Sequence, residues 1–207
     1  MGGMFDPVHN GHVLLAQSAR QYCQLDSVKM FPCGTPVHRS NAVAAAEHRE
    51  AMLKLACGDH DWLQIDKREC ASAAPSYTYH TVSALRAEHP SATLFLLLGL
   101  DAFLALDTWY RWQDLFALVH MVVAVRPGYK FEPGTLAPAF RQEVGARLAG
   151  QANDAAQHAA GRILLVALDL PDISSTQVRR LVHAGEDISA LVPAAVADYI
   201  AAKALYK

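Results

Sequence analysis

Residues 2–12 read GGMFDPVHNGH, and this stretch indicates how the rest of the chain folds. Its two leading glycines permit backbone conformations closed to other residues, so a ligand can approach the main chain closely. The Asp6-Pro7 pair favours an extended or turned path, because a residue before proline avoids the helical region. From His12 onward the apolar residues recur at helical spacing. The stretch therefore predicts a glycine turn, then a loop, then the start of a helix.

His9 and His12 fall beside that predicted helix start. A helix N-terminus carries unpaired N–H groups and a partial positive charge, so it favours an anion such as phosphate. Two other interpretations stay open on spacing alone. The pair could ligate a metal, although no third ligand and no second His or Cys cluster stands at ligand spacing, or it could be structural.

The composition limits the classes of function. The chain has 207 residues, is 52% hydrophobic and suits one packed domain over residues 1–207. A net charge of −2 gives no sign of a nucleic acid or an anionic membrane as partner. No apolar run approaches the roughly 18 residues that a membrane helix needs, and the given N-terminus lacks the basic start and apolar stretch typical of a signal peptide. The four cysteines form no C-x-x-C pair, so reduced thiols in a cytoplasmic protein are expected.

Strand and helix patterns alternate along the chain. Strands are predicted at 27–32, 62–66, 93–98, 120–125 and 162–168, and helices at 45–57, about 78–88, 140–148 and 193–205. Ser76 and Thr78 are candidate caps of the second of these helices, and Ser174 with Gln177 fits a capping box that opens another. The alternation predicts an α/β, Rossmann-like, doubly wound and mainly parallel sheet in a single domain. Neither the P-loop motif nor G-x-G-x-x-G is present.

Residues 2–12 resemble the opening motif of the nucleotidylyltransferase superfamily, Gly-Gly-Thr-Phe-Asp-Pro-x-His-x-Gly-His, with Met4 where relatives usually have threonine. Nearly the whole chain, through residues 173–176 and 191–193, is similar to the bacterial nicotinate-nucleotide adenylyltransferases. The resemblance implies transfer of the adenylyl group of ATP to nicotinate mononucleotide, with Mg²⁺ arriving on the ATP. These two substrates are the implied partners, and the resemblance gives no oligomeric state.

The resemblance also implies roles for individual residues, of which His9, His12 and Arg179 are the catalytic ones. The implied ATP-binding residues are Gly2, Gly3, Met4, Phe5, His9, Gly11, His12, Gly99, Asp101, Ile173, Ser174, Ser175, Thr176 and Arg179. The implied mononucleotide-binding residues are His38, Arg39, Ser76, Tyr77, Thr78, Trp109 and Tyr110. Without the resemblance, Arg39 would be a solvated cation, Tyr77 a core aromatic and the serines helix caps. Trp112 is expected to be structural.

Two alternatives remain. A sister adenylyltransferase would act on another phosphate, such as pantetheine phosphate or flavin mononucleotide, although residues 76–78 and 108–110 argue against it. A nucleotide-binding sensor without turnover would be consistent with Met4.

A further expectation concerns the first strand. Relatives usually have a short apolar strand before the two glycines, and here Met1 directly precedes them, so we expect that strand to be absent. A version with about six more apolar-rich residues at the front, a typical strand length, is expected to be more stable and more active.

Overall fold

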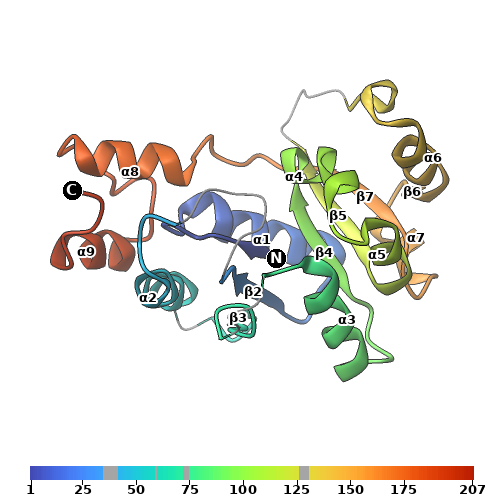
Figure 1. Ribbon diagram of the computed structural model, residues 1–207, viewed down its shortest axis with the longest axis horizontal. Coiled ribbons are helices and arrows are strands. Elements are labelled where there is room, and N and C mark those ends of the chain that lie inside the picture. Colours follow the sequence, from blue (N-terminus) through green and yellow to red (C-terminus); the bar gives the residue numbers. More distant parts are fainter. Residues whose placement is uncertain (35–41, 59, 72–74, 126–130) are drawn as a thin grey trace. The chain divides into compact units, whose positions relative to one another are not determined.

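The computed structural model describes residues 1–34, 42–58, 60–71, 75–125 and 131–207. These residues form two compact units, which are described one at a time (Figure 1). Unit 1 comprises Met1–Arg20, Leu25–Ser76 and Leu170–Lys207, and unit 2 comprises Gln21–Gln24 and Tyr77–Asp169. The single domain over residues 1–207 stays a prediction. In the described part of the chain, no helix combines the length and the apolar character needed to cross a membrane.

Unit 1 is built on a parallel sheet of three strands in the order β1-β2-β3. The strands are β1 (Gly2–Gly3), β2 (Val28–Pro32) and β3 (Leu63–Ile65). The apolar run of β2 is buried at Val28, Met30 and Phe31, as befits the middle strand of the three. The helices are α1 (Asn10–Cys23), which belongs to this unit up to Arg20, α2 (Ala46–Cys57), α8 (Ser175–His183) and α9 (Ala194–Ala202).

One hydrophobic core holds distant parts of the chain together in unit 1. Met30 of β2, Met52 of α2, Val178 of α8 and Ile200 of α9 belong to the same buried cluster. α2 packs directly against α9 (Figure 1). Burying side chains of this size contributes about 1.5–3 kcal/mol each, so the core fixes the C-terminal helices onto the N-terminal sheet.

The first strand is short rather than absent. Gly2 and Gly3 pair in parallel with Phe31 and Pro32. The Phe31 N–H donates to the carbonyl of Met1, and the Cys33 N–H donates to that of Gly3, both at 2.9 Å. The predicted glycine turn is therefore wrong, because the two glycines are themselves strand residues and the loop begins after them.

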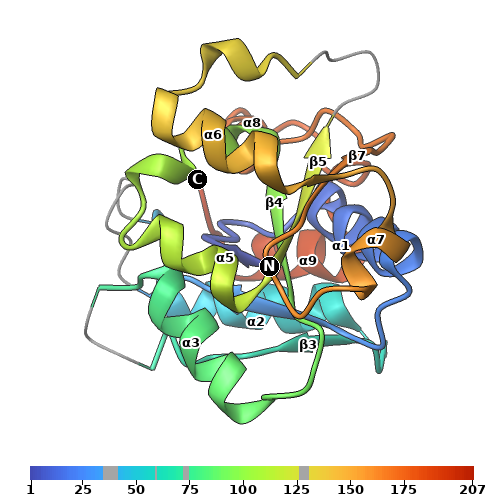
Figure 2. The same cartoon turned by 90° about the vertical axis from the view of Figure 1, so that its right-hand side faces the viewer.

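Unit 2 contains a second parallel sheet, with four strands in the order β4-β5-β7-β6. The strands are β4 (Phe95–Gly99), β5 (His120–Val125), β6 (Leu148–Ala149) and β7 (Ile163–Ala167). Figure 2 shows β4, β5 and β7 running side by side. Every residue of β5 is buried, as its continuous apolar run predicts. The α-helices are α3 (Thr78–Glu88), α4 (Leu100–Leu104), α5 (Leu115–Leu118), α6 (Pro138–Arg147) and α7 (Ala152–Ala156).

The predicted parallel α/β pattern is confirmed within each unit, and all five predicted strands are observed with small shifts at their ends. Trp112 is structural as expected, because its ring packs against those of Phe116 and Phe140. Two local predictions are wrong.

The first concerns the start of α3. Tyr77 is its N-cap residue and no side chain caps the helix, so neither Ser76 nor Thr78 has that role. The second concerns the helix predicted over 140–148. Leu148 lies outside that helix, because it belongs to β6 and its backbone pairs with Ile163 of β7.

Phe103 of α4 should be a main contributor to the stability of unit 2. Its side chain is completely buried, with its ring 5.3 Å from that of Phe140. We expect Phe103→Ala to lower the free energy of unfolding by about 3–5 kcal/mol, because the lost ring leaves a cavity. Urea unfolding followed by circular dichroism measures this. The control is Leu148→Ala at a side chain that is 39% exposed, which should cost less than about 1 kcal/mol. Equal losses in the two variants would contradict this account of the core.

Candidate active site

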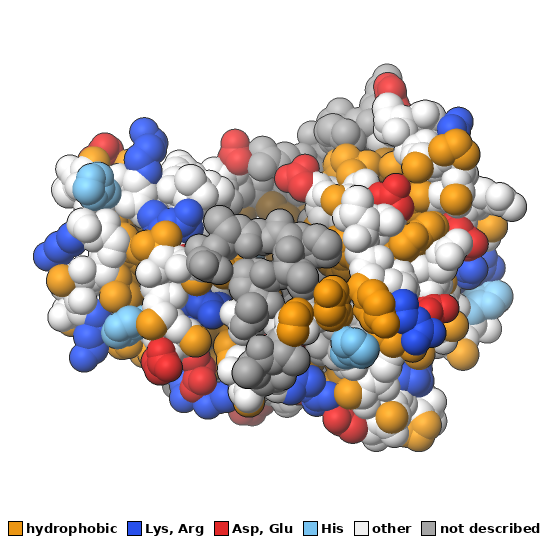
Figure 3. All heavy atoms as spheres, viewed as in Figure 1, with side chains coloured by type: hydrophobic (Ala, Val, Ile, Leu, Met, Phe, Trp, Pro, Cys, Tyr) orange, Lys and Arg blue, Asp and Glu red, His pale blue; other side chains and the backbone are white. Residues whose placement is uncertain are grey.

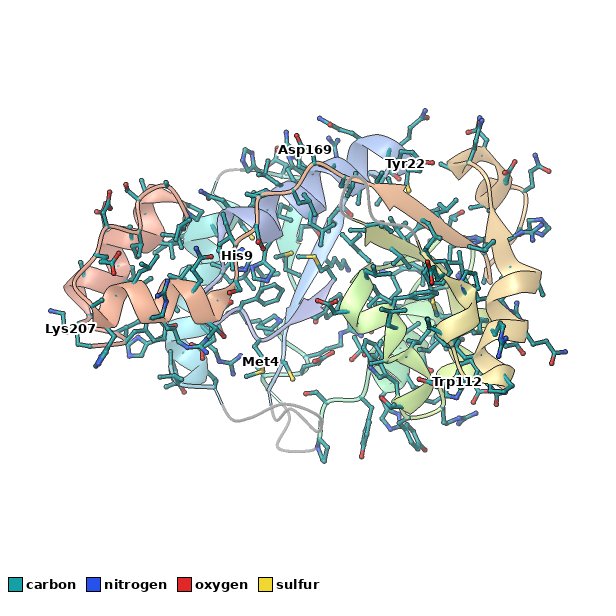
Figure 4. All side chains as sticks on the ribbon, turned by 90° about the horizontal axis from the view of Figure 1, so that it is seen from above. Met4, His9, Tyr22, Trp112, Asp169 and Lys207 are labelled. Atoms are coloured by element: carbon teal, nitrogen blue, oxygen red, sulfur yellow. The ribbon has the colours of Figure 1, made fainter. Side chains whose placement is uncertain are left out.

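The loop between β1 and α1, residues 4–9, is buried over most of its length. Phe5, Asp6, Val8 and His9 are all at most 7% exposed. Phe5 has a φ of 50°, in the left-handed region that residues with side chains rarely adopt. Such a conformation persists only where the surrounding structure fixes it. Met4 and His9, at the two ends of the loop, are labelled in Figure 4.

The Asp6 carboxylate fixes the path of this loop. It accepts hydrogen bonds from the N–H groups of Val43 (2.7 Å) and Ala44 (3.2 Å) and from the hydroxyl of Tyr206 (2.6 Å). Burial and the adjacent Asp6 carboxylate raise the pKa of Tyr206, so its hydroxyl stays a donor at neutral pH. Three segments far apart in the sequence therefore meet at one carboxylate.

His9 and His12 lie face to face at the start of α1. Their ring centroids are 3.7 Å apart, and the rings of His12 and Phe5 pack in a T-shaped arrangement. The His9 main-chain N–H donates to Nδ1 of His12 at 3.2 Å. Because that nitrogen accepts a hydrogen bond, the neutral His12 ring carries its proton on Nε2.

The His9 ring is buried with one polar atom unsatisfied. Its Nδ1 has no hydrogen-bond partner among the described residues. Burial lowers the pKa of His9 from 6.5 to about 4, so the ring is neutral at pH 7. A Cβ on Gly11 would lie 3.1 Å from this nitrogen, so glycine at that position leaves room for the ring. A buried polar atom without a partner calls for an explanation, and a polar ligand atom supplies one.

The first turn of α8 is attached to the same loop. Ser174 is the N-cap and accepts from the Gln177 N–H, which confirms this half of the predicted capping box; the return bond from the Gln177 side chain is not found among the described residues. The Ser175 hydroxyl donates to the carbonyl of Pro7 at 2.9 Å. The Arg179 guanidinium donates to the carbonyl of Asp6 at 2.7 Å and to the Thr176 hydroxyl at 3.2 Å. The structure thus brings the 2–12 stretch and the 173–179 stretch together within unit 1.

Metal binding by the two histidines has no further support in the described structure. No group of three or more His, Cys, Asp or Glu side chains that could hold a metal ion is found among the described residues. The geometry of this site instead offers hydrogen-bond donors, which suit phosphate oxygens.

Unit 2 carries the aromatic residues that the resemblance assigned to the mononucleotide. Tyr77 and Tyr110 lie 4.9 Å apart between ring centroids, and His80 lies 5.5 Å from Tyr110. Tyr110 is 46% exposed, and Figure 3 shows apolar side chains gathered on the surface of this unit. Trp109 is half-buried against the core and is not part of this ring cluster. Thr78 is the first residue of α3.

The remaining assigned residues are distributed as follows. Gly99 is the N-cap of α4 in unit 2, and Asp101 is an exposed residue in the first turn of that helix. Ser76 belongs to unit 1, and its hydroxyl oxygen is buried. His38 and Arg39 lie outside the described residues. The two units are described separately, so the ATP and mononucleotide assignments stay predictions as a set.

Sequence reasoning missed the contributions of Asp6 and Tyr206. The Asp6-Pro7 pair predicts only an extended or turned path, and the apolar neighbours Phe5 and Val8 are the one sequence signal that this acid is buried and therefore paired. Tyr206 gave no signal, because nothing local connects it with a residue 200 positions away.

The buried His9 predicts a specific dependence of stability on pH. The unfolded chain binds a proton on His9 below about pH 6.5, whereas the folded protein binds it only near pH 4. The free energy of unfolding therefore falls as the pH is lowered through this window, by about 2 kcal/mol between pH 7 and pH 5 from this residue. In urea unfolding, the free energy of unfolding of His9→Asn should therefore fall by about 2 kcal/mol less between pH 7 and pH 5 than that of the original chain.

Burial also lowers the pKa of His120, so this residue too makes the protein less stable as the pH falls. Its contribution is the same in the original chain and in His9→Asn, so it cancels when the two are compared. His89→Asn, at an exposed histidine, is the control and should keep the pH dependence of the original chain. An unchanged pH dependence in His9→Asn would contradict a neutral buried His9.

Comparison with known proteins agrees with these features. The family model described as Cytidylyltransferase-like matches residues 1–181. A protein of Laribacter hongkongensis is 45% identical over 209 residues, covering 100% of this chain and 92% of the relative. One of Cellvibrio japonicus is 42% identical over 208 residues, covering 100% and 96%. Both are named "Probable nicotinate-nucleotide adenylyltransferase".

Solved structures support the fold. The Plasmodium falciparum nicotinic acid mononucleotide adenylyltransferase complexed with NaAD has a TM-score of 0.73 at 17% identity, covering 99% of this chain and 94% of that one. The same enzyme complexed with APC has a TM-score of 0.71. This likeness confirms the predicted Rossmann-like α/β class. On the full-length identity to its relatives, the chain belongs to the nicotinate-nucleotide adenylyltransferase family of cytidylyltransferase-like proteins.

Proposed function

We propose that this chain transfers the adenylyl group of ATP to nicotinate mononucleotide, giving nicotinate adenine dinucleotide and pyrophosphate. The observation that carries the proposal is the stacked pair of His9 and His12 at the start of α1, with the first turn of α8 tied to the same loop. Relatives with the corresponding name align over the whole chain, and a structural neighbour was solved with NaAD.

The reaction needs positioning more than acid–base chemistry. A 5′-phosphate oxygen of the mononucleotide forms a bond to the α-phosphorus of ATP, while the bond from that phosphorus to the pyrophosphate oxygen breaks. The nucleophile is already an anion, so no general base is required. The enzyme must align the two phosphates and stabilise the charge that develops on the transferring and leaving groups.

The residues of unit 1 suit this task. Neutral His9 offers a ring nitrogen that has no partner in the described part of the chain, and His12, whose Nδ1 accepts a hydrogen bond, offers the proton on its Nε2. Both therefore act as hydrogen-bonding groups rather than as fixed cations. Arg179 adds a positive charge beside the loop while holding the carbonyl of Asp6. We propose that Mg²⁺ enters as part of the MgATP substrate, held by phosphate oxygens, as is usual for this ion.

The proposed roles of the other residues follow the family pattern. Gly99 and Asp101 would contact the ATP ribose, and Tyr77 with Tyr110 would stack on the pyridine ring. Arg39, with His38, would contact the mononucleotide phosphate. A cytoplasmic location is part of the proposal, and the four free cysteines are consistent with it.

A pyrophosphate-release assay tests the proposal directly. ATP is supplied with nicotinate mononucleotide, nicotinamide mononucleotide, flavin mononucleotide or pantetheine phosphate. Turnover with the first is the expected result, whereas turnover only with flavin mononucleotide or pantetheine phosphate would identify a sister adenylyltransferase. Nucleotide binding without any pyrophosphate release would identify a protein that has lost turnover.

His12→Ala should lower kcat by about 10²–10³-fold, because it removes one preorganised donor to a developing charge. The KM for the mononucleotide should change far less. Steady-state kinetics at saturating MgATP measure both, with His89→Ala in unit 2 as a control that keeps both values. A kcat within about threefold of the original, far inside that range, would exclude His12 from the mechanism.

The acid substrate should be strongly preferred over the amide. The start of α3 lies beside the Tyr77–Tyr110 pair and has no side-chain cap, so its first N–H groups suit the nicotinate carboxylate. We expect kcat/KM for nicotinate mononucleotide to exceed that for nicotinamide mononucleotide by at least about 100-fold, since a polar mismatch in a site discriminates strongly. Comparable values for the two substrates would contradict this assignment of the carboxylate site.

A further inference from the structure

Arg49 of α2 is a buried cation that joins two loops of unit 1. The residue is only 2% exposed. Its Nη1 donates to the carbonyl of Met4 at 2.9 Å and to the carbonyl of Cys33 at 2.8 Å. Met4 follows β1, and Cys33 follows β2, the strand paired with it. One guanidinium therefore holds the carboxyl ends of two neighbouring parallel strands, the region of an α/β sheet where ligands bind.

The surroundings of Arg49 leave its charge without an acidic partner. No ion pair with a carboxylate is found for it among the described residues, and its Nε has no hydrogen-bond partner there. Burying a cation in this way is costly unless something compensates it. An apolar side chain at position 49 would stabilise the core at least as well as a buried cation. The presence of the charge therefore points to an anionic ligand nearby.

The two hydrogen bonds also orient the main chain. In a trans peptide unit the C=O and the following N–H point in opposite directions. Because Arg49 draws the carbonyls of Met4 and Cys33 towards itself, the N–H groups of Phe5 and Gly34 point away from it. Within the described part of the chain, neither N–H donates to another group. A side chain at position 34 would collide with the carbonyl of Glu69, so glycine is required at this strand end.

We propose that Arg49 is a positioning residue for both substrates. It keeps two carbonyl oxygens away from the phosphates and presents the Phe5 and Gly34 N–H groups, together with its own positive charge, to phosphate oxygens. This inference rests on the proposed function for the identity of the second substrate, the mononucleotide, whereas ATP binding tests it independently of turnover.

The main test compares Arg49→Gln with Arg86→Gln. Arg86 of unit 2 is a matched control, because its guanidinium also binds main-chain carbonyls, among them those of Leu118 and Ala92. Both variants are expected to melt at lower temperatures than the original chain. Only Arg49→Gln should weaken MgATP binding in calorimetry and raise the KM of each substrate, by about tenfold or more, because it removes a nearby positive charge and the orientation of two N–H donors.

Arg49→Lys keeps the charge in a smaller head group that cannot reproduce the planar fork of arginine. If Arg49→Gln does not fold, Arg49→Lys provides the test. We expect Arg49→Lys to bind MgATP about three- to tenfold more weakly than the original chain, which is a smaller loss than in Arg49→Gln because the positive charge remains. Addition of millimolar ethylguanidinium to Arg49→Ala should restore part of the ATP affinity.

The inference is overturned if Arg49→Gln, or Arg49→Lys in its place, binds MgATP as the original chain does at a temperature where it is folded. It is also overturned if Arg86→Gln loses affinity to the same extent. Absence of turnover with nicotinate mononucleotide in the original chain would contradict the proposed function and leave the ATP-binding test of Arg49 intact.

Discussion

The buried carboxylate of Asp6 is the interaction on which the arrangement of unit 1 depends. An unpaired carboxylate in this position would be strongly destabilising, so its three donors are a condition for burying the loop at all. Those donors come from residues 43–44 and from Tyr206, while the Asp6 carbonyl accepts from Arg179. The loop therefore takes its shape from contacts with distant segments rather than from local preferences.

Two arginines of the candidate site bind main-chain carbonyls in the same part of unit 1. Arg49 holds the carbonyls of Met4 and Cys33, and Arg179 holds that of Asp6. Each contact turns a partial negative charge away from the ligand side of the loop and adds a positive charge beneath it. In the proposed reaction this site would act through oriented donors fixed before the substrate arrives, because the His9 ring is neutral and Nδ1 of His12 accepts a hydrogen bond.

Unit 2 contributes a different chemistry. Its cluster of Tyr77, Tyr79, His80 and Tyr110 presents aromatic faces, and the guanidinium of Arg111 lies 4.1 Å from the Tyr79 ring centroid. Planar rings of this kind can stack on a heteroaromatic ligand. Tyr79 of this cluster packs against the hydrophobic core of unit 2, to which the fully buried strand β5 contributes.

The sequence by itself determined the class of fold, because strand and helix periods are local properties of the chain. It located the strands and the histidine pair at a helix start, as well as the Ser174 cap, since each depends on residues only a few positions apart. It failed at Gly2–Gly3, where pairing with β2 decides the conformation, and at the start of α3, where no side chain forms the expected cap. Only the tertiary structure decided that Asp6 meets Tyr206, that His9 is buried enough to lose its charge, and that Arg49 faces inward. These features arise from contacts between segments tens to hundreds of residues apart, and an amphipathic helix pattern cannot distinguish a buried arginine from a solvated one.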